Sequence, residues 1–399
     1  MNKKLIALAV AAVMAPAAAM ADSGNVTIYG KMEASYDNIS TGAAGQDTLS
    51  RISSNSSQLG FKGSEDLGNG LSAIWQIENQ INVDSNGSAT SAASANGAAG
   101  TRNTFVGLSS KTMGTFILGT HDTPYKLGTL SLNVFGDSMG NYTSIVGSAN
   151  GTNVRDLRLG NVAAYISPTF NGFHGAIATS QLNEAGNSGL SNPSAWSATG
   201  VYDNGQLFAS LSYEIQKYAD AAATALSVQC LSAGGTISLI QTVAGCGAIG
   251  GTVLAGSNAA AATDSYDTKG TKLGLGWDFK QGTKVGFVYE KLNDSRTSQA
   301  GTRNAYVLNV AHTMGNNVIK AQYGKANDGE TALDTSAKNW TIGVDHNLSK
   351  RTSIYALYTK TDNAEGATYG VGGTKTTGAY TPAVGEDPRA VSLGVKHSF

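Results

Sequence analysis

Beyond its first twenty residues, the chain of 399 residues has no apolar run long enough to cross a membrane as a helix. Such a helix needs about 20 consecutive apolar residues, so a helical membrane protein is excluded. Charged residues are also scarce, at 14% of the chain, and the formal net charge is −1. Proteins that bind nucleic acid carry a basic surface, so nucleic acid is excluded as a partner.

Proline is rare, with 6 residues, but glycine is abundant, with 50, and tyrosine outnumbers phenylalanine by 16 to 10. Glycine inside a helix costs about 1 kcal/mol relative to alanine. The chain instead offers many short segments of alternating polarity separated by polar turns, which is typical of strands. A large sheet avoids exposed edges when it closes on itself. The composition therefore favours an all-β protein with one closed sheet.

The N-terminus has the three parts of a secretory signal. Lys3 and Lys4 precede an apolar stretch over residues 5–14, and a small-residue cleavage site follows at 19–21. An N-terminal membrane anchor is the alternative, but the apolar stretch is too short to span a bilayer. We therefore expect residues 1–21 to be cleaved and residues 22–399 to form a single barrel domain. Loss of the two lysines changes the formal net charge from −1 to about −3.

Cysteine is nearly absent, because the chain has only Cys230 and Cys246. Exported chains meet an oxidising compartment, so these two residues are predicted to form a disulfide within one long loop. No histidine or third cysteine lies near them in the sequence, so a zinc site is not expected there. We expect no metal and no cofactor elsewhere in the chain.

Residues 26–36 alternate strictly in polarity. Val26, Ile28 and Met32 share one face, whereas Lys31 and Glu33 share the other. The apolar face could point into the core of a soluble sandwich or outward to lipid, and the pattern alone does not decide between them. The same period recurs in residues 207–215, 319–323 and 391–399, whereas segments 284–292, 305–312 and 353–359 are apolar on both faces, which leaves their orientation open.

The connections decide between the two, because short and long ones alternate. The short ones are predicted at 63–70, 109–114, 203–206, 280–283, 314–317 and 347–351. The long ones are predicted at 37–50, 82–100, 121–157, 183–195, 218–269, 294–302, 328–337 and 362–388. A transmembrane barrel has short periplasmic turns and long external loops, whereas a sandwich has no reason to alternate them. The pattern predicts an antiparallel barrel of about sixteen strands in the outer membrane.

Five segments together resemble the general porins of beta-proteobacteria and Neisseria. They are VTIYG at 26–30, LGFKGSEDLGNGL at 59–71, VGL at 106–108, the stretch 158–173, and LGVKHSF at 393–399. The resemblance spans the whole mature chain. It implies a sixteen-stranded barrel, usually a homotrimer, set in outer-membrane lipid and letting ions and small hydrophilic solutes diffuse through a water-filled channel.

The resemblance also implies a constriction. The third long loop, 121–157, would fold into the lumen, with Asp137 and Asp122 on its acidic side. Lys62 and Arg158 match the basic residues of the opposite wall. The arginines that the family has at two further wall positions are here replaced by Gln58 and Thr120, so we expect only weak selectivity, of either sign.

Four further charged residues are candidates for the lumen: Lys31, Glu33, Glu78 and Arg102. The simplest interpretation is that they are ordinary solvated side chains. A role in selectivity requires in addition only that the pore is narrow enough for their electric field to act on a passing ion. Terminal Phe399 matches the C-terminal aromatic residue that the barrel-assembly machinery reads in this family.

An enzyme is not expected, because none of the five histidines lies in a catalytic sequence frame. Two other readings stay open. A substrate-specific channel would need an aromatic track or a dense arginine ladder in the lumen. A β-rich surface protein or adhesin without a pore would be extracted by salt, whereas a barrel would need detergent.

Overall fold

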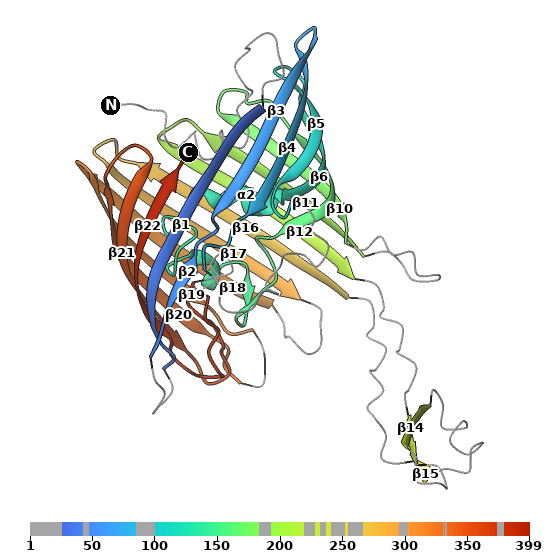
Figure 1. Ribbon diagram of the computed structural model, residues 1–399, viewed down its shortest axis with the longest axis vertical. Helices are drawn as coiled ribbons and strands as arrows, with labels where there is room; N and C mark the ends of the chain where they lie inside the picture. The colour runs from blue at the N-terminus through green and yellow to red at the C-terminus, as the bar shows by residue number, and fades with distance from the viewer. Residues whose placement is uncertain are drawn as a thin grey trace.

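A computed structural model describes residues 26–42, 48–84, 100–182, 193–218, 228–231, 237–240, 252–253, 266–294, 302–329, 331, 333–372 and 379–399. Its main sheet is antiparallel and rolled into a barrel of tilted strands (Figure 1). The strands of this sheet are β1 (Val26–Ser40), β2 (Leu49–Ser54), β3 (Gln58–Gly68), β4 (Leu71–Gln80), β5 (Thr104–Ser110), β6 (Gly114–Asp122), β9 (Arg158–Ile166), β10 (Phe173–Gln181), β11 (Ser194–Asp203), β12 (Leu207–Tyr218), β16 (Tyr266–Asp278), β17 (Thr283–Asp294), β18 (Thr302–Met314), β19 (Asn317–Ala326), β20 (Ala337–Asn347), β21 (Thr352–Asn363) and β22 (Arg389–Ser398).

The barrel closes between its first and last strands. β22 pairs with β1 from Lys31 opposite Ser398 to Ser40 opposite Arg389. Beyond that ladder, the backbone N–H groups of Gly30 and Phe399 each donate to the carbonyl of the other at 3.1 Å. β2 and β3 both pair with β1 and together fill one strand position, so the barrel has sixteen strands. Closure removes free sheet edges, which confirms the expected architecture.

The interruption between β2 and β3 is a bulge beside Glu33. Ser56 has a φ of 55°, and the register moves from Ala34 opposite Ser54 to Lys31 opposite Gln58. The Ser57 hydroxyl accepts from the N–H of Glu33 at 2.8 Å and donates to its carbonyl at 2.9 Å. The bulge therefore replaces ladder bonds with side-chain bonds and fixes the inward side chains around it.

Short and long connections alternate around the barrel, as predicted, and the structure adds a short one at 167–172 that was not predicted. The short ones are 69–70, 111–113, 167–172, 204–206, 279–282, 315–316 and 348–351. The first turn is tighter than expected, because β3 continues to Gly68 and only Asn69 and Gly70 remain. Both have positive φ, at 53° and 76°, which suits a two-residue hairpin turn.

Alternate side chains face lipid and lumen. On β1, Val26, Ile28, Met32 and Tyr36 are exposed on the outer face, whereas Glu33 is buried on the inner one. No helix among the described residues is long and apolar enough to cross a membrane.

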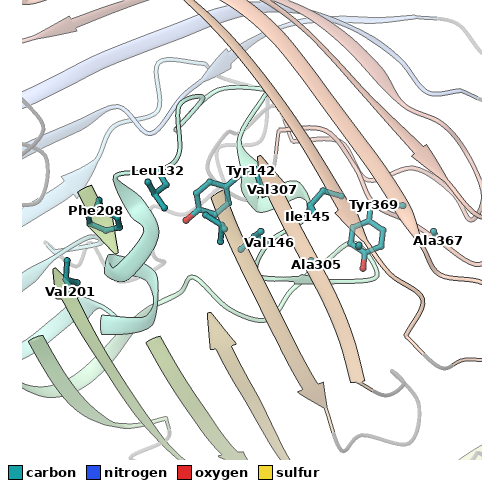
Figure 2. Close-up of a cluster of buried hydrophobic side chains, with 13 residues drawn as sticks. Leu132, Tyr142, Ile145, Val146, Val201, Phe208, Ala305, Val307, Ala367 and Tyr369 are labelled. Atoms are coloured by element: carbon teal, nitrogen blue, oxygen red, sulfur yellow. The ribbon is translucent and has the colours of Figure 1, made fainter. Parts of the chain in front are cut away.

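Some strands are apolar on both faces because a loop inside the barrel covers their inward side chains. Leu308 and Val310 of β18 are exposed outward, and Val307 faces inward, where it is fully buried. Val307 belongs to a cluster with Tyr142, Ile145 and Val146 of the connection between β6 and β9 (Figure 2). That connection contains helix α2 (Pro124–Leu130), the 3-10 turn η1 (Tyr142–Ser144) and the small hairpin of β7 (Ser148–Ala149) and β8 (Thr152–Asn153).

A separate three-stranded sheet lies in the connection between β12 and β16. It consists of β13 (Val228–Leu231), β14 (Ile237–Ile240) and β15 (Thr252–Val253). Cys230 is part of β13, but Cys246 and the signal at 1–21 lie outside the described residues. The disulfide and the cleavage therefore stay predictions.

Candidate functional site

Residues 123–157, called the inner loop below, fold into the barrel, where α2 is visible in Figure 1. The helix begins where the Thr123 hydroxyl accepts from the N–H of Lys126, with Pro124 in the first turn. It packs on the inner faces of β11, β12 and β16. Gly128 allows the approach, because a Cβ there would come within 2.1 Å of the Ser212 hydroxyl.

After the helix, the inner loop follows the wall towards β1. Asn309 of β18 donates to the carbonyl of Leu132 at 2.7 Å, and Gln322 of β19 donates to that of Gly140 at 3.0 Å. The tip then reaches β1, where the Lys31 ammonium lies 2.8 Å from the Asp137 carboxylate. The loop also covers part of the inner wall beyond β20, because Phe135 and Met139 cluster with Leu357 of β21, Ala390 of β22 and Ile39 of β1.

Glu290 of β17 is the centre of the contacts that hold the inner loop. Its carboxylate accepts from the Tyr125 hydroxyl at 2.7 Å and from the N–H of Gly147 at 2.8 Å, both in the loop. Arg303 of β18 also donates to it, at 2.8 Å. All of these side chains are buried, so each charge depends on its partner.

A second buried group fastens the end of the loop. Arg155 donates to the Thr268 hydroxyl at 2.7 Å and lies 3.7 Å from the Glu214 carboxylate. Asp156 forms an ion pair with Lys272, whose ammonium lies 4.2 Å from the centre of the Tyr125 ring. The loop is therefore bound at both ends to β12, β16, β17 and β18.

Arg158 of β9 makes its ion pair with Asp122, the other acidic candidate, rather than with Asp137. It donates to Asn103 at 2.7 Å and lies 3.2 Å from Asp122, which also forms an ion pair with Lys126.

Glu78 of β4 joins the other wall residues. It is almost fully buried and accepts from Arg102 at 2.7 Å, from the Tyr29 hydroxyl at 3.0 Å and from Gln58 at 3.3 Å. Arg102 is thereby neutralised in place. Because the Gln58 amide donates to Glu78, an arginine at position 58 would lie next to the Glu78 carboxylate.

Lys62 and Glu33 lie on the same inner face. Lys62 is exposed, and its ammonium lies 5.2 Å from the centre of the Tyr29 ring. It makes no ion pair with any residue that the structure describes. Glu33 is buried between Lys31, at 2.8 Å, and Lys396 of β22, at 3.9 Å.

Two predicted positions lie outside this chain of contacts. Thr120 sits beside Gly160 of β9, at a register shift between Gly119 and His121. Phe399 lies at the barrel seam, where its ring covers Gly30 so closely that a Cβ there would come within 2.5 Å.

The sequence model of the Gram-negative porin family matches residues 7–366. The chain belongs to the Gram-negative porin family. It is 28% identical to outer membrane porin protein 32 of Delftia acidovorans over the whole of both chains. It is 34% identical to the major outer membrane protein P.IB of Neisseria gonorrhoeae, over 55% of this chain and 59% of that one.

Solved outer-membrane proteins share the fold. An anion-selective porin from Comamonas acidovorans superposes with a TM-score of 0.71 at 22% identity, covering 94% of this chain and 99% of that one. OmpT of Vibrio cholerae superposes with a TM-score of 0.60 at 13% identity, covering 96% and 99%. The chain is thus an outer-membrane porin.

A second loop of the porin enters the barrel from the connection between β21 and β22. Asn150, at the tip of the β7–β8 hairpin, accepts from the N–H of Thr368 at 2.9 Å and donates to the carbonyl of Gly366 at 3.1 Å. The N–H of Asn150 also donates to the hydroxyl of Tyr369 at 3.1 Å, and this tyrosine is buried against the inner loop (Figure 2). Neither the alternation nor the resemblance indicated this contact.

Asn150→Ala is expected to loosen the inner loop without unfolding the porin. It removes the side-chain bonds to residues 366 and 368, each worth about 1 kcal/mol. We expect noisier open-channel current and closure at lower voltage in planar bilayers, with the heat-modifiable gel mobility of a folded barrel unchanged. The matched control is Asn204→Ala, whose side chain accepts from Gln206 and Leu207 in a periplasmic turn. Equal noise in the two variants would show that the hairpin tip does not hold the loop.

Asp137 is expected to stay charged in acid. Its depth in the barrel alone would raise its pKa, but the ammonium of Lys31 and the guanidinium of Arg102 together hold the pKa below its ordinary value. Because the pKa of Asp137 is depressed, its ion pair stays intact through the pH range in which an ordinary aspartate takes up a proton. The pair is lost only in stronger acid. The difference in reversal potential between wild type and Asp137→Asn should therefore be the same at pH 7 and at about pH 4. If the pKa of Asp137 had the ordinary value of about 3.9, roughly half of this difference in reversal potential would be lost at about pH 4.

Proposed function

We propose that this porin is a general diffusion channel for ions and small hydrophilic solutes, with no saturable site, no catalytic role and only weak charge selectivity. The observation that carries this proposal is the pairing of the wall arginines. The guanidinium of Arg102 lies 2.7 Å from the carboxylate of Glu78, and that of Arg158 lies 3.2 Å from the carboxylate of Asp122. Because each guanidinium faces a carboxylate, the wall offers solutes alternating charges rather than a ladder of one sign.

The experiment is a conductance series with a reversal-potential measurement. Single-channel current should rise almost linearly with salt concentration, because a wide aqueous lumen conducts without binding. In a salt gradient, the reversal potential should stay near zero. Saturation by a solute at low millimolar concentration would reject the general channel and favour a substrate-specific one.

Gln58→Arg offers a direct test of the weak selectivity. The new guanidinium would lie beside Glu78 and Arg102, where Gln58 now donates at 3.3 Å. We expect the reversal potential to move towards anions, and Thr120→Arg, outside the chain of contacts, to have a smaller effect. The Comamonas acidovorans neighbour is described as anion-selective. An unchanged potential in Gln58→Arg would remove this position from the constriction.

A homotrimer is also part of the proposal. The outer face of β1, β2, β21 and β22 carries an apolar groove lined by Ala34, Tyr36, Ile52, Ala356, Leu393 and Val395. The fold neighbours include a trimeric form of the Vibrio cholerae protein. We expect the wild-type porin to be a trimer in detergent. Conversion to folded monomers by Ala34→Trp and Ala356→Trp would support this interface.

The route to the membrane completes the proposal. Cleavage of residues 1–21 would follow export, and the barrel-assembly machinery would read Phe399. The pairing of Cys230 with Cys246 would close a loop of about 16 residues, worth roughly 3 kcal/mol in the chain-entropy model. Barrel assembly should survive Cys230→Ser with Cys246→Ser.

A further inference from the structure

Asp37 is a buried carboxylate on the inner face of β1, where this strand pairs with both β2 and β22 (Figure 1). Its side chain is 0% exposed, and neither of its oxygen atoms has a hydrogen-bond partner among the residues that the structure describes. Burial of an ionised carboxylate without a partner is costly. Such a group therefore needs a partner from outside the chain.

The other buried carboxylates in the described part of the barrel show what is unusual about Asp37. Each has a lysine or arginine nitrogen within 4.0 Å, and they are Glu33, Glu78, Asp122, Asp156, Glu214 and Glu290. Asp37 forms no such ion pair with any residue that the structure describes. Arg51, directly opposite on β2, is within electrostatic range of both Asp37 and Asp84. One guanidinium is thus shared by two carboxylates, which leaves one negative charge uncompensated.

Two serine hydroxyls share this inner face with Asp37. Ser392 of β22 is directly opposite Asp37, and Ser53 of β2 is two residues from Arg51. Both are 0% exposed, and neither hydroxyl oxygen has a hydrogen-bond partner among the described residues. Directly opposite residues have Cβ atoms about 4.5 to 5.5 Å apart, so these side chains are neighbours that do not bond to one another. Oxygen atoms that bind a common metal ion have this arrangement, because each lies about 2.3 to 2.6 Å from the ion.

Asn55 adds a further oxygen on the side of the bulge. Its amide nitrogen donates to the Ser35 hydroxyl at 2.9 Å and to the Tyr355 hydroxyl at 2.8 Å. Its amide oxygen has no hydrogen-bond partner among the described residues, although the side chain is buried. The atoms left without a partner in this region are therefore a carboxylate, two hydroxyls and an amide carbonyl.

The inner loop covers this group from the lumen. Ile39, two residues further along β1, packs with Phe135 and Met139 of the inner loop. Attraction between a carboxylate and a cation is stronger in such an enclosed place than in bulk water. An ion bound at Asp37 would join β1, β2 and β22 at the seam of the barrel.

We propose that Asp37, Ser53 and Ser392 bind one hard metal cation, for which Ca²⁺ has the best fit. Ca²⁺ takes oxygen ligands in flexible geometry, so the Asn55 amide oxygen and water can complete the set, whereas Mg²⁺ needs a nearly ideal octahedron. Because the site has a single carboxylate, we expect a dissociation constant of about 0.1 to 1 mM. The ligands come from separate strands and form no motif, so the sequence alone predicts no metal here.

The test measures Ca²⁺ binding and thermal stability of the full-length porin in detergent. Protein treated with EDTA and dialysed is titrated with CaCl₂ by isothermal titration calorimetry. The unfolding temperature is read from heat-modifiable gel mobility, in EDTA and in about 5 mM CaCl₂. Asp37→Asn removes the charge and keeps the shape. The matched control is Asp345→Asn, which removes another inward carboxylate, one that forms an ion pair with Lys320 at 2.7 Å.

Wild type should bind one Ca²⁺ per chain, and Ca²⁺ should raise its unfolding temperature by about 2 to 4 °C. Asp37→Asn should weaken binding at least about tenfold and abolish this rise. In EDTA, Asp37→Asn should unfold at the wild-type temperature or above it, because it removes a buried charge that lacks a partner. Asp345→Asn should keep the full rise with Ca²⁺.

A pair of serine variants tests the neutral ligands, and it also decides the matter if Asp37→Asn does not fold. Ser392→Ala and Ser210→Ala each remove a buried hydroxyl without a partner from the inner wall, the second one on β12. Ser392→Ala should weaken Ca²⁺ binding at least about threefold, whereas Ser210→Ala should leave it unchanged.

Four results would overturn the proposal. The first is no Ca²⁺ binding to wild type up to about 10 mM. The second is an equal rise of the unfolding temperature in wild type and Asp37→Asn, which would place the ion elsewhere. The third is an equal loss of stability in Asp37→Asn with EDTA and with Ca²⁺, which would make Asp37 a structural partner of Arg51. The fourth is equal stabilisation by NaCl at the same ionic strength, which would mean a general effect of salt.

Discussion

Replacing Glu78 with glutamine is expected to turn a weakly selective pore into an anion-selective one. In the wild type, the Glu78 carboxylate lies 2.7 Å from the guanidinium of Arg102, and their side chains are 7% and 14% exposed, respectively. Glutamine has nearly the same shape and keeps an oxygen that can accept from Tyr29 or Arg102. The substitution therefore leaves the geometry in place and frees one positive charge beside the exposed Lys62.

A unit charge a few ångströms from a permeating ion is worth about 1 to 4 kcal/mol in a partly hydrated pore. Even the lower value corresponds to about a fivefold change in the ratio of anion to cation permeability. The measurement is the reversal potential in a salt gradient, repeated at high salt, where a shorter Debye length should reduce the shift.

The matched control is Glu65→Gln. Glu65 is an exposed carboxylate near the first periplasmic turn, so its loss changes net charge equally without touching the constriction. A shift of the same size in both variants would place the selectivity in the overall charge of the barrel. No shift in Glu78→Gln would mean that Arg102 does not act on the permeating ion.

The barrel could be predicted from the sequence because its evidence is local. Alternation within residues 26–36 reports one strand, and a short polar connection such as 203–206 reports one hairpin. The orientation of β17 and β18 could not be predicted in this way. Val288 and Val307 face inward and are apolar because Tyr142, Ile145 and Val146 of the inner loop cover them. A contact between segments that are distant in the sequence produces no periodic pattern of polarity in either segment.

The same limit applied to the constriction. The resemblance pointed to the loop and to Asp137, but it did not indicate that Asp137 would form its ion pair with Lys31, 106 residues away in sequence. The path of the loop decides that pairing, and the path depends on buried anchors such as Glu290 and Arg155. Charged residues on strands that are otherwise apolar on both faces, as Glu290 and Arg303 are, were the available sign that a polar partner enters the barrel.

Removal of the central anchor should release the inner loop while the barrel persists. In Glu290→Ala, the Tyr125 hydroxyl, the N–H of Gly147 and the guanidinium of Arg303 all lose their acceptor. Breaking a buried ion pair from one side costs about 3 to 5 kcal/mol, mostly through the charge that is left without a partner. The barrel ladders are untouched, so we expect folded porin whose inner loop is cut by proteases and whose single-channel current is noisy.

Glu290→Ala with Arg303→Ala supplies the decisive comparison. If the uncompensated guanidinium causes most of the damage, the double variant should be less disturbed than Glu290→Ala alone, in both protease sensitivity and current noise. Tyr125 and Gly147 still lose their bonds, so the double variant should remain noisier than wild type. Damage that simply adds, with the double variant worse than either single one, would mean that Arg303 holds the loop by contacts of its own and that Glu290 is not the centre of the anchor.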